Sequence, residues 1–252
     1  MNLLVVTPTY NERDNLPVLA AGVLKYDGAR MLIVDDGSPD GTGAVADQLA
    51  KDHPGRVEVM HRTGPRGLGR SYVDGLQRAI GDTSVEFICQ MDADLSHNPE
   101  YLPEMVKAAA TQDLVIGSRY LHGVSVVNWP LHRIFLSAFG NRYIRLVTSL
   151  SASDCTSGYR CWRREALARL PIAEMVSDGY AFLVEMLYEA SRRGLRIGEV
   201  PIIFIERRMG QSKLSSNVLI ESLIMPWRLV FRSRPQSGTG AQPQQPGREA
   251  RP

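Results

Sequence analysis

The chain has 252 residues, of which 44% are hydrophobic and 22% charged, and its formal net charge is +2. This is a globular composition, and so small a net charge excludes a global field that would draw the protein to nucleic acid. The cysteines lack CxxC spacing, so neither a zinc site nor a disulfide framework is expected. The N-terminus does not read as a signal peptide, and no apolar stretch reaches the roughly 18 residues of a membrane-spanning helix.

The first half of the chain alternates short apolar runs with stretches of helical periodicity. The apolar runs predict strands at 3–7, 31–36, 57–62, 85–91 and 113–118. The stretches between them predict helices at 15–25, 41–53 and 68–80 and another that begins near Pro99. Because the strands are apolar throughout, helices should cover both faces of a mostly parallel sheet. The pattern predicts a doubly wound α/β fold, whose ligands bind outside the carboxyl ends of the strands.

After Tyr120 the alternation stops. Residues 121–150 are apolar, aromatic and rich in arginine, without a clear order of strands and helices. The later segments predict a helix at 183–194, a strand at 195–206 and a helix at 217–231. Pro226 is expected to kink or end the last of these helices.

Polar clusters follow the ends of four predicted strands, in the order TPTYNE, DDGSPDG, DADLS and GSRY. The carboxyl ends of parallel strands share one edge of a sheet, so these clusters predict a single site. Asp92 and Asp94 flank Ala93, and residues two apart in an extended chain point to the same side. Two such carboxylates predict Mg²⁺ or Mn²⁺ as a cofactor that shares its remaining positions with substrate phosphates.

Three residues at the ends of the first two strands are candidates for a nucleotide site. Asp36 is placed to hydrogen-bond a ribose or a base, Tyr10 to stack on a base, and Glu12 to contact either. The G-x-G-x-x-G fingerprint is absent after the first strand, which disfavours NAD and FAD. Further along, Asp154 and Arg160 in SDCTSGYR are expected to hold the floor of the site or to pair with each other. His97, which follows DADLS, suggests no function.

Together the motifs resemble the family 2 glycosyltransferases, over roughly residues 3 to 216. They are TPTYNERDNLP, IVDDGSPDGT, GLGRSYVDGL, MDADLSHNPE, IGSRY, TSGYRCWRREAL and GEVPIIFIERRMGQSKL. Within the family, the chain is most similar to the dolichol-phosphate and polyprenol-phosphate mannosyltransferases. The resemblance implies a GT-A-type fold, a GDP-mannose donor and a polyprenyl monophosphate acceptor. It also implies a catalytic domain at 1–216 and a membrane-proximal helix at 217–232. Residues 233–252 are rich in Pro and Gln, and this composition predicts a disordered tail.

The resemblance also assigns individual residues. It places around the nucleoside Pro8, Tyr10, Glu12, Val34 and Asp36. It places at the metal and the diphosphate Asp92, Ala93 and Asp94, with Arg119 beside them. Arg207 and Lys213 would come from a loop that closes over the phosphates. The residues expected to act in catalysis are Asp94, Arg119, Arg207 and Lys213.

The implied reaction builds negative charge on the leaving diphosphate, which the cation, Arg207 and Lys213 would stabilise. An acceptor phosphate is already an anion, so inverting transfer to it needs no strong base. Its charge must instead be neutralised, and Arg119 and Arg133 are the candidates. Two alternatives stay open: a polyprenyl-phosphate glucosyltransferase that uses UDP-glucose, and a non-catalytic binding protein on the same fold.

The segments 121–150 and 217–231 combine apolar and aromatic residues with arginines, as interfacial helices do. They predict a peripheral protein at the cytoplasmic face of a membrane, with a possible anchoring partner protein. The alternative is that these residues cap the core or pack a dimer.

Overall fold

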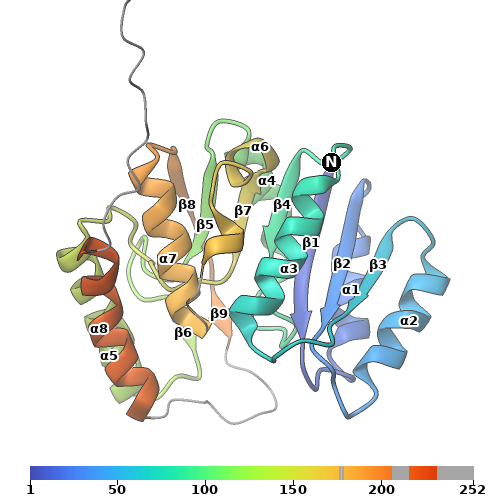
Figure 1. Cartoon of the computed structure of the whole chain (residues 1–252), viewed down its shortest axis with the longest axis horizontal. Helices are drawn as coiled ribbons and strands as arrows, with labels where there is room; N and C mark the ends of the chain where they lie inside the picture. Colours follow the sequence, from blue (N-terminus) through green and yellow to red (C-terminus); the bar gives the residue numbers. More distant parts are fainter. Residues whose placement is uncertain (176, 178, 206–215, 232–252) are drawn as a thin grey trace, which may run out of the picture.

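The computed structural model of the chain describes residues 1–175, 177, 179–205 and 216–231, and in the last of these ranges the side chains from 223 onward. Helices cover both faces of a seven-stranded sheet (Figure 1). Its strands are β1 (Leu3–Thr9), β2 (Ala29–Asp35), β3 (Val57–His61), β4 (Phe87–Gln90), β5 (Leu114–Ser118), β7 (Arg160–Arg163) and β8 (Ile197–Pro201). A second, two-stranded parallel sheet pairs β6 (Val126–Val127) with β9 (Phe204–Ile205).

The strand order of the large sheet is β3-β2-β1-β4-β7-β5-β8, and only the pairings of β7 are antiparallel. This confirms the prediction of a mostly parallel α/β sheet. The chain builds outward from β1 to β3 and then returns to place β4 on the other side of β1. The order therefore reverses between β1 and β4, where open α/β sheets bind their ligands.

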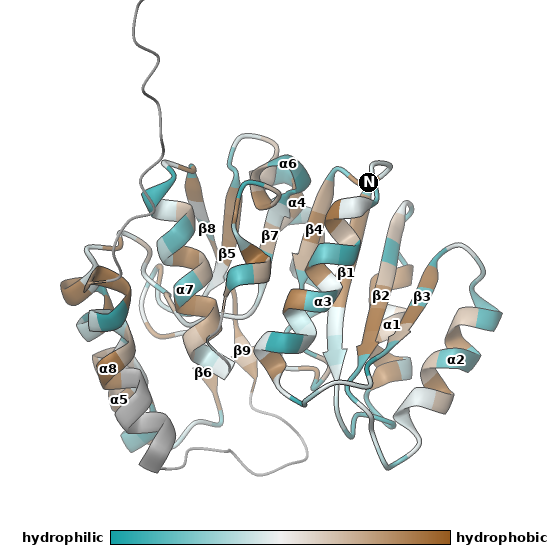
Figure 2. Cartoon of the chain, viewed as in Figure 1, coloured by the Kyte–Doolittle hydropathy of each residue, from teal (hydrophilic) through white to brown (hydrophobic). Residues whose placement is uncertain are grey.

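The helices form two layers around this sheet. One layer contains α1 (Leu16–Leu24), α2 (Thr42–Asp52) and α4 (Leu102–Ala109), and the other contains α3 (Leu68–Gly81), α6 (Arg164–Leu167) and α7 (Gly179–Arg192). Short 3₁₀ turns cover Pro99–Tyr101 and Ile172–Glu174. Leu3 and Val5 of β1 pack into the first core, whereas Leu4 and Val6 pack into the second. This two-sided burial explains why β1, β2, β4 and β5 are mostly apolar, and much of their length is brown in Figure 2.

The irregular second half contains elements that the sequence did not predict. Residues 121–150 hold β6 and one long helix, α5 (Leu131–Thr148). Only Asn141, Ile144 and Thr148 of that helix are buried, so its apolar residues do not mark a single inward face. The predicted strand at 195–206 is divided into β8 and β9, and the four-residue strand β7 was missed altogether.

The last helix, α8 (Ser216–Phe231), lies beside α5 and α7 at the β8 end of the sheet (Figure 1). It continues through Pro226 rather than ending there. The Tyr143 hydroxyl of α5 donates to the main-chain oxygen of Leu223 at 2.7 Å and accepts from Trp227 Nε1 at 2.8 Å. In the described part of the chain, no helix is both long enough and apolar enough to cross a bilayer.

Candidate active site

The two predicted metal ligands lie directly after β4, beside the point where the strand order reverses. The Asp92 side chain is 29% exposed, whereas Asp94 is 7% exposed and Ala93 between them is buried. The structure thus places the pair at the carboxyl edge of the sheet.

Neutral donors hold both carboxylates in position. The Tyr72 hydroxyl, from α3, donates to Asp92 Oδ1 at 2.8 Å. Burial, and then the negative charge of Asp92, raise the pKa of Tyr72 well above its ordinary value, so the phenol keeps its proton. Ser96 donates its hydroxyl and its main-chain N–H to Asp94 Oδ1, at 2.5 Å and 3.1 Å. These bonds orient the carboxylates without neutralising them.

His97 also supports this loop, a role that the sequence did not indicate. Its Nδ1 accepts the main-chain N–H of Asp92 at 3.0 Å, so the ring proton must sit on Nε2. That nitrogen lies 3.9 Å from Asp92 Oδ2, and the buried ring stacks on Tyr159 with 5.0 Å between centroids. With Nδ1 engaged and Nε2 protonated, His97 offers no lone pair to a metal. It positions Asp92 instead.

The donor set at Asp92 and Asp94 fits a hard divalent cation. Both ligands are carboxylates, the oxygen donors that Mg²⁺ and Mn²⁺ prefer. Within the described residues, no group of three His, Cys, Asp or Glu side chains forms a complete protein cage. A cation held here would therefore take its other ligands from water and from a substrate such as a diphosphate.

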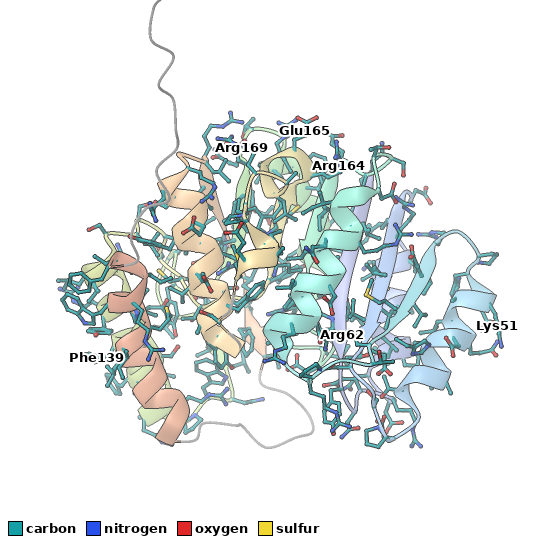
Figure 3. All side chains as sticks on the ribbon, in the orientation of Figure 1. Lys51, Arg62, Phe139, Arg164, Glu165 and Arg169 are labelled. Atoms are coloured by element: carbon teal, nitrogen blue, oxygen red, sulfur yellow. The ribbon has the colours of Figure 1, made fainter. Side chains whose placement is uncertain are left out.

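Two of the residues predicted to contact the nucleoside, Asp36 and Tyr10, bind arginines from the segment after β3. Asp36 accepts from the Arg62 guanidinium and, at 2.9 Å, from the main-chain N–H of Gly67. Arg62 also donates to Asp74 at 2.6 Å. Burial opposes the charge on Arg62, but its bonds to Asp74 and Asp36 outweigh burial and raise its pKa. Figure 3 shows Arg62 beside the start of α3, at the lower edge of the sheet.

Tyr10 and Glu12 also have protein partners. The Arg66 guanidinium lies 4.8 Å from the centroid of the Tyr10 ring and donates to its hydroxyl at 2.8 Å. Glu12 accepts from Asn15 Nδ2 at 2.7 Å. The predicted base-stacking surface of Tyr10 is therefore covered by Arg66, which the sequence did not single out. Arg66 itself is exposed to solvent.

Pro8 and Val34 contribute differently from the polar residues around them. Both side chains are buried, and a Cβ on Gly75 of α3 would lie 2.8 Å from Val34 Cγ2. Only glycine permits this close approach of α3 to the sheet. The Val34 side chain thus packs under α3, and a nucleoside contact by this residue would involve its main chain.

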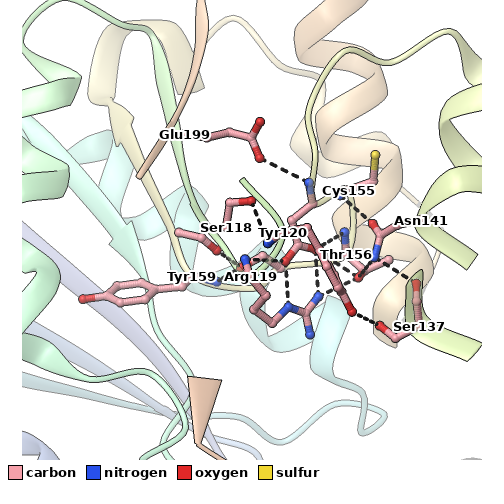
Figure 4. A network of polar contacts seen from close by, with 12 residues as sticks. Ser118, Arg119, Tyr120, Ser137, Asn141, Cys155, Thr156, Tyr159 and Glu199 are labelled. Atoms are coloured by element: carbon pink, nitrogen blue, oxygen red, sulfur yellow. Dashed lines mark hydrogen bonds and ion pairs between the residues drawn. The ribbon is translucent and has the colours of Figure 1, made fainter. Parts of the chain in front are cut away.

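On the other side of β7, Arg119 follows β5 and forms a buried ion pair with Asp154. Arg119 Nε and Nη2 donate to the two Asp154 oxygens at 2.6 Å and 2.7 Å, and Nη2 also donates to Thr156 at 2.8 Å (Figure 4). Burial disfavours the charge on each partner. Their mutual attraction outweighs it, so the pKa of Arg119 is raised and that of Asp154 is lowered. Arg119 is therefore oriented before any ligand binds.

The predicted pairing of Asp154 with Arg160 is wrong. Arg160 is fully buried and, among the described residues, donates to main-chain oxygens alone, those of Ser157 at 2.9 Å, Leu183 at 2.6 Å and Cys155 at 3.1 Å. Burial without a carboxylate partner lowers the pKa of Arg160 to about 10. Arg160 thus fastens the loop that carries Asp154 to α7, under the site.

Aromatic side chains surround Arg119 and bring Arg133 to the same place. Arg119 lies 5.7 Å from the Trp129 ring centroid and 5.4 Å from that of Phe204. Arg133, in the first turns of α5, lies 4.2 Å from the Trp129 centroid. The small β6–β9 sheet makes this possible, because it joins the segment before α5 to the segment after β8. The two predicted acceptor arginines thus share one indole ring.

Phe204 connects the two sides of the site. Its ring centroid lies 6.0 Å from that of His97, which supports Asp92, and its ring also faces Arg119. The carboxylate pair and the arginine pair are therefore neighbours along one edge of the sheet. Arg207 and Lys213, predicted from the loop after β9, lie outside the described residues.

Comparisons with known proteins agree with this geometry. The pattern that defines the glycosyl transferase family 2 matches residues 4–170. The polyprenol monophosphomannose synthase of Mycolicibacterium smegmatis is 44% identical over 233 residues, which cover 92% of this chain and 88% of that protein. The undecaprenyl-phosphate mannosyltransferase of Micrococcus luteus is 42% identical over 236 residues, which cover 92% and 96%.

Solved structures show the same fold at lower identity. The glucosyl-3-phosphoglycerate synthase of Mycobacterium tuberculosis, in complex with Mn²⁺, UDP and glucosyl-3-phosphoglycerate, superposes with a TM-score of 0.62 at 20% identity. The match covers 91% of this chain and 77% of that one. The fold is therefore of the GT-A type, as expected. Since the family pattern spans most of the chain and both relatives match nearly all of it, this protein belongs to glycosyl transferase family 2.

Proposed function

We propose that this protein transfers mannose from GDP-mannose to a polyprenyl monophosphate at a membrane surface, with inversion at the sugar. The names of the two relatives, at 44% and 42% identity, support the sugar and the lipid. One structural observation carries the proposal. A carboxylate pair suited to a cation and a diphosphate lies next to an arginine pair suited to a second phosphate, with Phe204 between them.

On the donor side, Asp92 and Asp94 would hold Mg²⁺ or Mn²⁺. When bound, the cation supplies positive charge where the leaving diphosphate becomes negative. Tyr72, Ser96 and His97 keep the carboxylates in place, so little reorganisation is needed as that charge develops. Arg207 and Lys213 are proposed to add further positive charge over the diphosphate.

On the acceptor side, Arg119 and Arg133 would bind the lipid phosphate. One phosphate oxygen forms a bond to the anomeric carbon while the bond from that carbon to the diphosphate breaks, and GDP leaves with the electron pair. The attacking oxygen is already ionised, so no proton has to be removed and no base is required. Asp92 and Asp94 accordingly have no role as bases.

The membrane surface in this proposal is formed by α5 and α8. Both helices expose large apolar side chains, namely Leu131, Phe135, Leu136, Phe139, Leu146, Leu223, Ile224, Trp227, Val230 and Phe231. Figure 3 shows Phe139 at the outer edge of the molecule, away from the sheet. Between the helices lies a hollow of about 410 Å³ lined by Phe139, Arg142, Tyr143, Leu146, Val147 and Trp227. Apolar and aromatic side chains beside arginines suit the interface of an anionic bilayer.

The test of the reaction compares two donors with the same acceptor. The purified protein is incubated with polyprenyl monophosphate, Mg²⁺ or Mn²⁺, and either GDP-mannose or UDP-glucose, and the lipid-linked sugar is quantified. We expect product from GDP-mannose and its loss on chelation. Product from UDP-glucose alone would overturn the mannose assignment. No product with either donor, despite nucleotide binding, would favour the non-catalytic alternative.

The test of the membrane surface is co-sedimentation with vesicles that contain anionic lipid. Replacing Phe135 and Phe139 together by Ser should release the protein from the vesicles, because both side chains are exposed and would insert. Val18→Ser, on α1 and 59% exposed, is the matched control and should not change binding. If the double variant binds vesicles as well as the wild-type protein does, the apolar residues of this face cap the core. If the two substitutions instead dissociate a dimer, this face packs a dimer.

A further inference from the structure

The chain has three tryptophans, and their indole N–H groups are not in equivalent states. Trp162 donates to Gln90 Oε1 and Trp227 to the Tyr143 hydroxyl, each at 2.8 Å. The Nε1 of Trp129 is buried and has no hydrogen-bond partner among the described residues. Buried indole N–H groups usually find a partner, and an unsatisfied one in a folded protein calls for an explanation.

The surroundings of Trp129 supply that explanation. Arg133 and Arg119 lie 4.2 Å and 5.7 Å from its ring centroid, and the ring packs edge-to-face with Phe204 at 5.5 Å. Two guanidinium groups near each other repel, but both are attracted to the electron-rich face of an indole. Trp129 therefore holds the two proposed acceptor arginines together, and its own N–H is an additional donor in the same cluster.

Arg119 needs such a helper because most of its donor capacity is already used. Its Nε and Nη2 bind Asp154 and Thr156, so only Nη1 has no partner among the described residues. The charge of Arg119 is also balanced by Asp154. A phosphate monoester presents several acceptor oxygens and nearly two negative charges. A neutral N–H in the cluster adds a bond to that group without adding another buried charge.

We infer that Trp129 is a further acceptor-binding residue, which donates its indole N–H to the phosphate of the prenyl monophosphate. The inference rests on the proposed function, since it takes the arginine pair as the acceptor site. It assigns Trp129 two tasks: the ring keeps Arg119 and Arg133 in position, and Nε1 contacts a phosphate oxygen. The unsatisfied N–H is then a donor kept for the substrate.

The first test replaces Trp129 by Phe, which keeps an aromatic ring but removes the N–H. Steady-state kinetics with a short-chain, water-soluble prenyl monophosphate should show a KM for the acceptor that rises about tenfold or more, the loss expected for one hydrogen bond to a charged group. The KM for the sugar nucleotide and the slow release of sugar to water should be unchanged. The thermal midpoint should not fall, because the lost donor was unsatisfied.

Trp162→Phe is the matched control. It also removes one indole N–H, but from Gln90 in the core, so it lowers stability while the KM for the water-soluble acceptor should be unaltered. If the wild-type protein transfers sugar and Trp129→Phe retains the wild-type acceptor KM, the inference is wrong while the proposed function stands. If donor and acceptor KM rise together, Trp129 acts through the fold and the inference is also wrong. No transfer by the wild-type protein would reject the proposed function itself.

A second measurement does not depend on any variant folding. In the ¹⁵N–¹H spectrum of the wild-type protein, one of the three indole resonances should move downfield when the short prenyl monophosphate is added. The other two indoles already have partners and should shift little. A protein that transfers sugar while all three indole resonances stay in place would overturn the inference.

Discussion

The donor side and the acceptor side of the proposed site hold their charged side chains with opposite kinds of partner. On the proposed donor side, Asp92 and Asp94 accept hydrogen bonds from the neutral hydroxyls of Tyr72 and Ser96. On the proposed acceptor side, Arg119 is bound to a carboxylate that balances its charge. Neutral donors orient a carboxylate that is to meet a cation, whereas the ion pair with Asp154 fixes the geometry of an arginine that is to meet an anion.

The two sides also differ in how the chain assembles them. The donor carboxylates follow one strand and are two residues apart. The acceptor cluster brings together Arg119, Trp129, Arg133, Asp154 and Phe204, which come from four separate segments of the sequence. Disturbing the donor side should therefore affect the chemistry more than the fold, and disturbing the acceptor side should affect both.

The largest effect on transfer is expected from Asp94→Ala. Loss of a metal-holding carboxylate should lower kcat by at least about 10²- to 10³-fold, as for other groups that stabilise developing charge. The free energy of unfolding should fall by only about 1–3 kcal/mol, the cost of leaving the buried Ser96 hydroxyl without its acceptor. Turnover with Mg²⁺ and thermal unfolding are measured together. Asp14→Ala, at an exposed position, is the control, and wild-type turnover by Asp94→Ala would contradict the metal role.

The contrast between the two sides is sharpest for Asp154→Asn. Breaking a buried ion pair leaves Arg119 uncompensated, so we expect a loss of about 3–5 kcal/mol in the free energy of unfolding. The acceptor KM should also rise more than the donor KM, because Arg119 loses its orientation. Urea unfolding measures the first effect and steady-state kinetics the second.

Glu58→Gln is the control for that variant. It breaks the ion pair with Arg78. Both side chains of that pair are about half exposed, so the expected loss in the free energy of unfolding is at most about 1 kcal/mol. Equal losses for the two variants would mean that Asp154 contributes no more than a surface ion pair.

A smaller effect is expected from His97→Phe, which tests whether the His97 side chain holds the main chain of Asp92 in place. The Phe ring keeps the stacking on Tyr159 but leaves the buried N–H of Asp92 without an acceptor, at a cost of about 1–3 kcal/mol. More Mg²⁺ should then be needed for half-maximal activity. His122→Phe, at an exposed position, is the control. An unchanged Mg²⁺ requirement would show that His97 does not position Asp92.

The smallest effect is expected for the pH dependence of stability caused by His61, a residue that belongs to neither the donor side nor the acceptor side. Its bond to Asp47, opposed by burial and assisted by Asp35, raises the pKa of His61 above 6.5. A raised folded-state pKa means that the stabilisation is present below about pH 6.5 and is lost as the pH rises through the folded-state value. Asp47→Asn should reduce this slight pH dependence. If the urea midpoint changes by the same amount between pH 5.5 and pH 8 in the wild-type protein and in Asp47→Asn, this prediction is wrong.

The parts of the fold that could be predicted are those in which one physical signal dominates. Strands buried on both faces are continuously apolar, and this pattern located the parallel strands and their carboxyl edge. The strand β7 has only four residues and begins and ends with arginine, so it carries no such signal. Helix α5 was missed because its apolar side chains are exposed rather than gathered on a buried face.

The same division holds for the site. Asp92 and Asp94 could be singled out because both follow the end of an apolar strand, although the chain turns at Ala93 and Asp94 and is not extended there. The roles of Tyr72 and His97 were not predictable, and neither was the partner of Asp154, because these hydrogen bonds join residues whose separation in sequence no local pattern encodes. The pairing of Asp154 with Arg160 failed for this reason: proximity in sequence did not decide which arginine the carboxylate meets.

By itself, the sequence determined the family, the α/β alternation and the position of the carboxylate pair, since all three follow from short-range patterns of polarity and spacing. Only the tertiary structure decided the acceptor side. The order of β4, β7 and β5 and the pairing of β6 with β9 bring distant residues to one indole ring. Which buried charge is balanced, and which buried N–H has no partner among the described residues, depends on those long-range pairings.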